Sequence, residues 1–152
     1  MLRAGIIGCG GIAERRHAPV LNTLKGVTLA ALADTSTDRL AELGELYNVP
    51  EDDRHTDVEA MLANAELDLV HICTPHDLHV EQAMAALQAG AHVLLEKPIS
   101  TTLEEADRIM AAATAAGRKV AISHNQLWSA GHRAVRRVVE AGDLGDIFFV
   151  RS

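Results

Sequence analysis

A glycine-rich segment lies near the start of the chain. It reads Gly8-Cys9-Gly10-Gly11-Ile12-Ala13 and satisfies the pattern G-x-G-x-x-G/A. The loop follows a short apolar run and precedes a stretch of helical period, which is the setting of a dinucleotide-binding turn. The first glycine permits the tight bend, the second lets a pyrophosphate approach the backbone, and the last small residue lets helix and strand pack closely. Free amides and the dipole at the helix start favour phosphate charge. We therefore predict that this loop binds a dinucleotide through Gly8, Gly10, Gly11, Ile12 and Ala13; the alternative is a turn without a ligand.

An acidic residue at the right distance supports the same interpretation. Asp34 follows Ala13 by 21 residues and stands at the end of the second apolar run. A carboxylate at that place accepts hydrogen bonds from an adenosine ribose. Because it would also repel a 2′-phosphate, Asp34 favours NAD over NADP, although Arg39 could offset the repulsion and leaves NADP open. The alternative role for Asp34 is to cap a helix that begins near Ser36.

Lys97 is the candidate for chemistry on a substrate. It stands in Glu96-Lys97-Pro98, directly after the apolar run at 92–95. In a doubly wound sheet this strand end faces the ligand crevice. An ammonium there offers a compact charge and three donors, which suit it to hold a substrate hydroxyl and to stabilise developing alkoxide charge. The alternative is an exposed lysine without such a role, and either isomer of the Lys97–Pro98 peptide bond is open.

A third polar cluster, Cys73-Thr74-Pro75-His76-Asp77-Leu78-His79, closes one apolar run and opens a helical stretch. Its cysteine and histidines could suggest zinc, but no second ligand group at zinc-site spacing accompanies them, so we predict no metal site. We expect instead a loop that lines the cofactor groove, with Thr74 or Asp77 capping the helix that follows.

These residues need a framework that brings them together, and the chain supplies an alternating one. Short apolar runs alternate with longer helical stretches, and the runs lack strict polar/apolar alternation, as expected when both faces of a strand are covered. The expected strands are residues 2–7, 27–33, 67–73, 92–95 and 119–123. The pattern predicts an α/β fold with a doubly wound, Rossmann-like parallel sheet. Asn125, just past the last strand, is expected at the same edge as the loops; its alternative is a polar loop that satisfies only backbone groups.

Several helix signals can be tested. Thr56 with Glu59 and Thr102 with Glu105 fit the capping box, in which hydroxyl and carboxylate satisfy free amides. Pro19 predicts a break or kink inside the first helical stretch. The helix after Thr102 is expected to pack on the sheet through one stripe, namely Leu103, Ala106, Met110 and Ala113.

Composition narrows the class of protein. The 152 residues suffice for one domain with its own core, and 48% apolar with 23% charged residues is ordinary for a globular protein. A net charge of −7 without a basic run argues against nucleic acid as a partner. No apolar segment approaches the roughly 18 to 20 residues of a membrane span, and the start shows no secretory signal. The two cysteines lie in or beside predicted strands and suit reduced thiols, so we expect a cytoplasmic protein.

Residues 124–152 are expected to lie outside the domain that the rest of the chain forms. An amphipathic helix is predicted over 129–141, a turn at 142–145 and a new strand at 147–150. A strand that opens at the last residues is an awkward end, so we expect a fragment of a longer protein. The predicted organisation is a nucleotide-binding domain at 1–123 and, at 124–152, a linking helix with the start of a second α/β domain that is absent from this chain.

Four segments together resemble one family. They are the glycine loop, Cys73-Thr74-Pro75 with His79, the run from Ala89 to Pro98, and Gly142-Asp143-Leu144-Gly145. Over nearly its whole length the chain is similar to the glucose-fructose oxidoreductase and inositol dehydrogenase family (Gfo/Idh/MocA). The resemblance implies that the full-length protein is a two-domain NAD- or NADP-dependent enzyme acting on a CH–OH group of a sugar, a cyclitol or a related small molecule.

The resemblance also implies roles for residues. Lys97 matches the family's active-site lysine, and Asn125 falls where a polar residue often lies near the nicotinamide. The positions that match groove-lining, cofactor-binding residues are Thr74, Pro75, His79 and Glu96. Gln126-Leu127-Trp128 departs from the Arg-Phe-like pair common in the family, which leaves the local substrate preference open. The family's C-terminal Asp and proton-transferring His have no counterpart in this chain, and contacts for a homo-oligomer would lie mostly in that second domain.

The expected reaction is hydride transfer between nicotinamide C4 and a secondary alcohol or ketone, with Lys97 orienting the oxygen and the fragment alone inactive. A rival function is a noncatalytic dinucleotide-binding or sensing module, in which Lys97 has only phosphate or structural contacts. A methyltransferase also uses a glycine loop and an acidic residue, but Glu96-Lys97-Pro98 argues against it.

Overall fold

Six parallel strands form one sheet in the computed structural model, which describes residues 1–151. Their order is β3-β2-β1-β4-β5-β6, so the direction of winding reverses between β1 and β4. The strands are β1 (Leu2–Ile7), β2 (Val27–Ala33), β3 (Arg54–His55), β4 (Leu69–Ile72), β5 (His92–Leu95) and β6 (Val120–Ile122). The predicted doubly wound α/β fold is confirmed, and its switch point lies at the carboxyl ends of β1 and β4.

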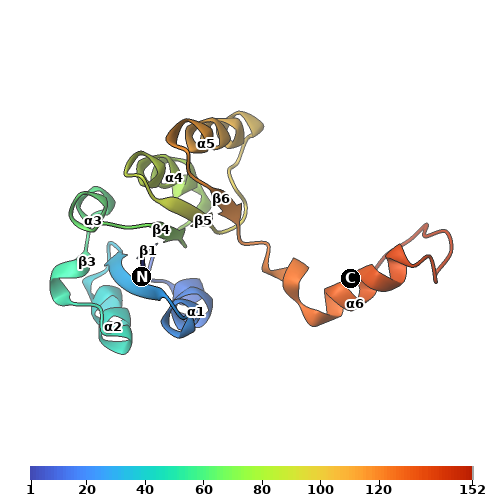
Figure 1. The fold of residues 1–152 in the computed structure, drawn as a ribbon, viewed down its shortest axis with the longest axis horizontal. Coiled ribbons are helices and arrows are strands. Elements are labelled where there is room, and N and C mark those ends of the chain that lie inside the picture. The colour runs from blue at the N-terminus through green and yellow to red at the C-terminus, as the bar shows by residue number, and fades with distance from the viewer. Residues whose placement is uncertain (152) are drawn as a thin grey trace.

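Helices cover both faces of the sheet, with α4 and α5 on one side and α1 and α2 on the other (Figure 1). In chain order the helices are η1 (Ala13–His17, a π-helical turn), α1 (Ala18–Thr23), α2 (Thr37–Tyr47), η2 (Glu51–Asp53), α3 (Val58–Asn64), η3 (His76–Leu78), α4 (His79–Gln88), α5 (Leu103–Ala116), η4 (Asn125–Trp128) and α6 (Ala130–Glu140). Neighbouring strand residues point to opposite faces, so Ile6 enters the core beneath α1 and α2 while Ile7 enters the core beneath α4 and α5.

The strand predictions hold with small differences. Strands 2–7, 27–33 and 92–95 are confirmed at both ends, whereas 67–73 and 119–123 shorten to Leu69–Ile72 and Val120–Ile122. The sequence gives no sign of β3, which pairs with β2 through Leu32–Arg54 and Ala33–His55. Two polar residues cannot produce an apolar run, and only pairing with β2 makes them a strand.

One predicted capping box is confirmed and one is wrong. Thr102 Oγ1 accepts from Glu105 N at 3.2 Å, and the Glu105 carboxylate accepts from Thr102 N at 3.3 Å. For α3, Asp57 is the cap, because its carboxylate accepts from Ala60 N at 2.8 Å, one residue later than the Thr56 cap that we predicted. A carboxylate suits a helix start better than a hydroxyl does, since its charge also complements the helix dipole.

Two further expectations concern helix geometry. At Pro19 the helix does not stop; it changes at Ala18 from the π-turn η1 to the α-helix α1, so the predicted break is a change of helix type. The predicted stripe of α5 is wrong in part, since Leu103 is 80% and Met110 51% exposed. The core contact of α5 is centred on Ile109, which is fully buried.

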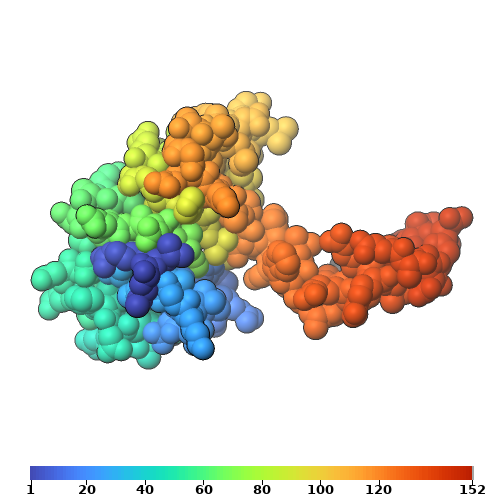
Figure 2. Space-filling view, in the orientation of Figure 1, coloured from blue at the N-terminus to red at the C-terminus, as the bar shows by residue number. Residues whose placement is uncertain are grey.

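After β6 the chain leaves the sheet as an arm, residues 124–151, that stands away from the body of the domain (Figures 1 and 2). The helix predicted over 129–141 is confirmed as α6, and Ser129 caps it. The strand predicted at 147–150 is wrong: these residues form no strand, and Phe148 is 98% exposed. A strand needs a partner for its backbone groups, and the arm carries none for this segment among the described residues. None of the helices described is long and apolar enough to cross a bilayer.

Candidate functional site

The glycine loop is tightly packed at one glycine and open at another. Gly8 has φ +88°, and its N–H donates to the Ala33 carbonyl at 2.8 Å. A Cβ on Gly8 would lie 2.9 Å from the backbone carbon of Cys73 and 2.9 Å from Thr74 Cγ2. A Cβ on Gly10 would meet no atom within 4 Å. The loop therefore turns tightly at Gly8 and leaves its backbone bare at Gly10, as close approach of a pyrophosphate requires.

A groove of about 350 Å³ runs beside this loop at the carboxyl edge of the sheet. Its lining includes Gly8, Gly10, Asp34, Thr74 and Pro75. These residues follow β1, β2 and β4, so the topology brings five of the predicted cofactor residues to one place. Behind the loop, Ile12 precedes η1 and Ala13 is completely buried, which lets the helix start close to the sheet. Gly11 lies beside the Arg15 guanidinium.

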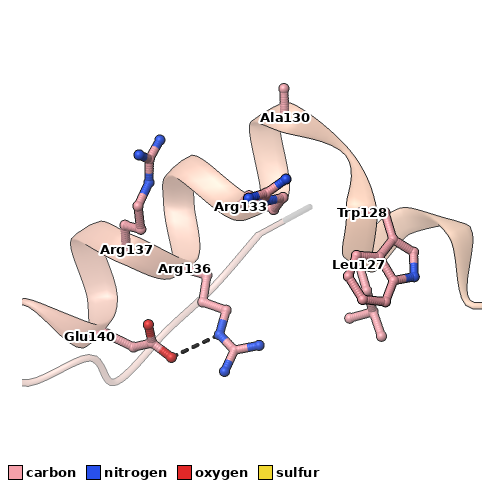
Figure 3. Close-up of a pocket in the computed structure, with 7 residues that line it drawn as sticks. All are labelled: Leu127, Trp128, Ala130, Arg133, Arg136, Arg137 and Glu140. Atoms are coloured by element: carbon pink, nitrogen blue, oxygen red, sulfur yellow. Dashed lines mark hydrogen bonds and ion pairs between the residues drawn. The ribbon is translucent and has the colours of Figure 1, made fainter.

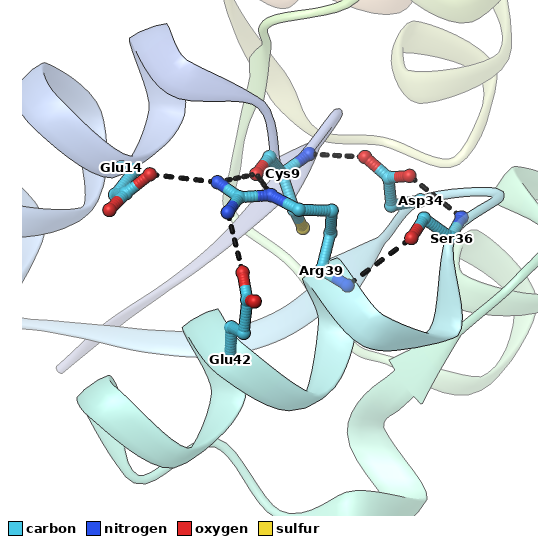
Figure 4. Close-up of polar contacts among 6 residues, drawn as sticks. All are labelled: Cys9, Glu14, Asp34, Ser36, Arg39 and Glu42. Carbon is cyan, nitrogen blue, oxygen red and sulfur yellow. Dashed lines mark hydrogen bonds and ion pairs between the residues drawn. The ribbon is translucent and has the colours of Figure 1, made fainter.

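Asp34 both holds the loop and lines the groove (Figure 4). Its Oδ2 accepts from Cys9 N at 2.6 Å and its Oδ1 accepts from Ser36 N at 2.8 Å. The cap of α2 is the Ser36 hydroxyl, which accepts from Arg39 N at 3.3 Å. A carboxylate oxygen can accept two hydrogen bonds, so Asp34 retains capacity for a ligand hydroxyl.

The Arg39 guanidinium lies over the loop, already partnered (Figure 4). Its Nε and Nη2 donate to the Cys9 carbonyl at 3.0 and 2.8 Å. It also pairs with Glu14 at 2.8 Å and with Glu42 at 2.5 Å. The hydrogen bond with Glu14 raises the pKa of Arg39, and the same bond lowers the pKa of Glu14. The carboxylates of Glu14 and Glu42 thus offset the positive charge of Arg39, which a 2′-phosphate would need as its partner.

Lys97 is exposed at the end of β5 and lines a hollow of about 330 Å³ together with Ser123 and Asn125. The peptide bond between Lys97 and Pro98 is cis. The structure therefore brings Lys97 and Asn125 together, as predicted from their strand-end positions. Glu96 is only 7% exposed and its carboxylate faces His17, at the edge of a second hollow of about 400 Å³ that it lines with Ser123 and Asn125.

His79 is a buried bridge between two loops. Its Nδ1 lies 2.8 Å from the Pro98 carbonyl oxygen and its Nε2 lies 3.0 Å from the Thr74 carbonyl oxygen. It does not line the groove, since it is 1% exposed. The predicted cap by Thr74 or Asp77 is wrong: the 3₁₀ turn η3 precedes α4, and the Thr74 hydroxyl donates to Gln82 Oε1 at 2.5 Å.

A buried polar network that the sequence pattern did not predict lies beside Lys97. His17 Nε2 is 3.0 Å from Glu96 Oε1, and His17 Nδ1 is 3.0 Å from His71 Nδ1. All three residues are at most 7% exposed. Burial alone would raise the pKa of Glu96, but hydrogen bonds from His17 and Ser123 outweigh it and lower that pKa. The available signal was a histidine inside an apolar strand at position 71, which needs a polar partner.

His71 predicts a specific loss of stability in acid. Burial, with His17 nearby, lowers the pKa of His71 from 6.5 to about 4. Between these values the unfolded state binds more protons at His71 than the folded state does. The free energy of unfolding is therefore unaffected by this group above about pH 6.5 and decreases as the pH falls toward 4. Urea unfolding at about pH 7.5 and about pH 5 is expected to differ by about 2 kcal/mol from this group. His71→Gln, which does not titrate, is expected to reduce that difference; an undiminished loss in His71→Gln would contradict the assignment.

Among residues 1–151, no three His, Cys, Asp or Glu side chains form a group that could hold a metal ion. Cys9 and Cys73 are buried thiols without a disulfide. Burial, followed by the charge of Asp34, raises the pKa of Cys9 to about 12, and burial also raises the pKa of Cys73. Both thiols are therefore poor metal ligands and poor nucleophiles.

A larger hollow of about 480 Å³ lies on the arm, far along the chain from the groove (Figure 3). It is lined by Leu127, Trp128, Ala130, Arg133, Arg136, Arg137 and Glu140. Arg136 Nε donates to Glu140 at 2.7 Å, and the other side chains are exposed. A surface built on one exposed segment lacks the convergent polar groups of a ligand site, so the groove at the sheet edge is the better candidate.

Comparison with known proteins finds a matching family model and similar dehydrogenases. Residues 2–124 match the model of the family described as "Oxidoreductase family, NAD-binding Rossmann fold". The chain is 28% identical over 146 residues to scyllo-inositol 2-dehydrogenase (NADP(+)) of Bacillus subtilis (strain 168), covering 96% of this chain and 39% of that protein. It is 33% identical over 148 residues to D-glucoside 3-dehydrogenase of Escherichia coli (strain K12), covering 97% and 41%.

A solved structure is similar over almost the whole chain. Scyllo-inositol dehydrogenase from Lactobacillus casei, with bound NAD(H) and scyllo-inositol, superposes with a TM-score of 0.87 at 26% identity. The match covers 97% of this chain and 43% of that one. The chain thus spans about two fifths of the length of the relatives that it matches.

Proposed function

Because the chain belongs to the oxidoreductase family with an NAD-binding Rossmann fold, we propose that it is the cofactor-binding part of an enzyme that oxidises a CH–OH group or reduces the corresponding ketone. The proposed substrate is a sugar, a cyclitol or a related polyol, the class named for relatives such as scyllo-inositol 2-dehydrogenase and D-glucoside 3-dehydrogenase. One observation carries the proposal: the bare backbone at Gly10 and the Asp34 carboxylate line one groove, and Lys97 stands at a nearby strand end of the same edge.

The residues fit a bound nicotinamide dinucleotide. Amides at the start of the helix and the open space at Gly10 suit the pyrophosphate, and Asp34 suits the adenosine ribose. When bound, NAD supplies the hydride acceptor. The Lys97 ammonium would donate to the substrate oxygen and stabilise alkoxide charge. The group that removes the hydroxyl proton is proposed to lie outside these 152 residues, so the chain alone should bind cofactor without turnover.

The arm is proposed to begin a second domain, with the boundary near residue 124. Its apolar side chains support this organisation, because Trp128, Val135 and Phe148 are 77%, 62% and 98% exposed. Apolar groups exposed together in one segment are typical of a surface that another part of a protein covers.

The proposal is tested by melting the chain with NAD, NADP and S-adenosylmethionine. Ligand at about a hundredfold excess over its dissociation constant stabilises by about 2.7 kcal/mol, a rise of several degrees for a chain of this size. Nicotinamide dinucleotide is expected to raise the melting temperature and S-adenosylmethionine to leave it unchanged. The opposite result would favour a methyltransferase. Rapid oxidation of a polyol by the isolated chain would contradict the proposal that the group that removes the hydroxyl proton lies outside these 152 residues.

Asp34 is expected to set the choice between the two cofactors. Asp34→Asn keeps an acceptor for the Cys9 amide but removes the charge that repels a 2′-phosphate. NAD affinity should fall roughly tenfold, because hydrogen bonds to a charged group are stronger than those to an amide. NADP affinity should fall less or rise. Paired titrations measure the ratio, and an unchanged NAD/NADP ratio would remove Asp34 from the ribose site.

A further inference from the structure

The buried network of His17, His71 and Glu96 links the helix of the glycine loop to the strand end that carries Lys97. We propose that His17 is a positioning residue, which holds the Glu96 carboxylate and through it the Lys97 end of β5 in place relative to the cofactor loop. The inference rests on the proposed function in one respect, that Lys97 is the group that meets the substrate oxygen.

The two oxygens of Glu96 have separate partners. Oε1 faces His17 Nε2 at 3.0 Å, and Oε2 accepts from the Lys97 backbone amide at 3.3 Å. The Glu96 side chain is 9% exposed and needs such partners, because an unpaired buried charge is strongly unfavourable. His17, together with the Ser123 side chain, therefore fixes the orientation of the carboxylate, and the carboxylate in turn fixes the amide at which the Lys97 turn begins.

The helix that carries His17 is specialised at this point. The Ala18 amide donates to the Ala13 carbonyl, five residues back, which makes η1 a π-helical turn. Turns of this kind are rare and frequent at functional sites. Here Ala13, at the end of the glycine loop, and His17 are both buried against the sheet. A ligand that fixes the glycine loop thereby also fixes the helix turn that presents His17.

The other side of the same turn is held as well. His79 contacts the Pro98 carbonyl and the Thr74 carbonyl, and Thr74 lines the groove. Lys97 thus stands between two buried histidine contacts, of which the one through His17 acts on its own amide. The exposed ammonium projects from a backbone that is fixed on both sides.

Selective labelling gives a direct readout on this chain, because its only lysines are Lys25, Lys97 and Lys119. A ¹⁵N-lysine sample yields three lysine amide signals, and Lys97→Arg identifies the one of interest. We compare the native chain with His17→Met, which keeps bulk but removes the donor. The matched control is His71→Gln, since His71 is equally buried and contacts His17 but not Glu96.

In His17→Met the Lys97 amide is expected to shift and to exchange its hydrogen roughly tenfold faster, the effect of losing one hydrogen bond. The Lys25 and Lys119 signals should stay in place, and His71→Gln should leave all three unchanged. His17→Gln, which restores a donor, should return the Lys97 signal toward its native position. A native Lys97 amide in folded His17→Met, or equal changes in His17→Met and His71→Gln, would overturn the proposal.

In His17→Met the buried Glu96 carboxylate loses its partner, which could unfold the chain. The same comparison is therefore also made in the Glu96→Gln background. Position 96 then carries no charge. Adding His17→Met to Glu96→Gln is expected to shift the Lys97 amide signal relative to Glu96→Gln alone, and no shift would overturn the proposal. NAD titration of the same samples separates the two claims. His17→Met should change NAD affinity by no more than about threefold, because His17 does not line the groove. Absence of NAD binding by the native chain would count against the proposed function while the comparison of Lys97 amides still decides the role of His17.

Discussion

Gly8→Ala is expected to lower the free energy of unfolding by about 2–5 kcal/mol, because two costs add at this position. The backbone has φ +88°, a conformation that side chains disfavour by about 1–2 kcal/mol. The new methyl group would also lie 2.9 Å from the Cys73 backbone, which cannot move without shifting β4. Overpacking of this kind costs about 1–3 kcal/mol. Urea unfolding of native and variant chains measures the difference.

Gly26→Ala separates the two costs. Gly26 has nearly the same φ, +84°, but a Cβ there meets no atom within 4 Å. Its substitution should therefore lose only the conformational part, about 1–2 kcal/mol. Equal losses in Gly8→Ala and Gly26→Ala would show that the contact between the glycine loop and the end of β4 is not tight.

Gly10→Ala is expected to have the opposite profile, a large loss of NAD binding with an unchanged melting temperature. A methyl group at Gly10 meets no protein atom within 4 Å, so the folded chain should accept it. The same methyl group would occupy the space through which a pyrophosphate reaches the backbone amides. A steric cost of about 1–3 kcal/mol corresponds to a loss of affinity of roughly tenfold to a hundredfold. Calorimetric titration gives the affinity and thermal melting gives the stability.

The contrast between these glycines distinguishes a binding loop from a mere turn. If the loop were only a turn, Gly10→Ala would be silent in both measurements. Undiminished NAD affinity in Gly10→Ala would show that the pyrophosphate does not approach the loop there.

The edge of the sheet and its residues followed from the sequence because the relevant signals are local. The glycine spacing, Asp34 after the second apolar run and Lys97 after the fourth each depend on a strand end, and parallel strands bring those ends to one edge. The positions of the apolar runs were equally informative, since three of five predicted strands match the observed strands at both ends. The resemblance to a known family pointed to the same positions.

Contacts between distant segments did not follow from the sequence. His17 and Glu96 are 79 residues apart, and nothing local indicates that a π-turn directs one toward the other. His79 was expected in the groove because it matches a groove-lining position of the family that the chain resembles, but the turn η3 carries it beneath the loop. The strand predicted at 147–150 failed for a related reason, because a short apolar run becomes a strand only where a partner strand supplies hydrogen bonds.

Calorimetric titration of this chain with NAD, repeated on Asp34→Ala, tests the central claim most directly, because it needs neither a substrate nor a second domain. Saturable binding at one site that weakens roughly tenfold or more in Asp34→Ala is the predicted result. Absence of binding, or binding of equal strength in a folded Asp34→Ala chain, would contradict the assignment of the groove as the dinucleotide site.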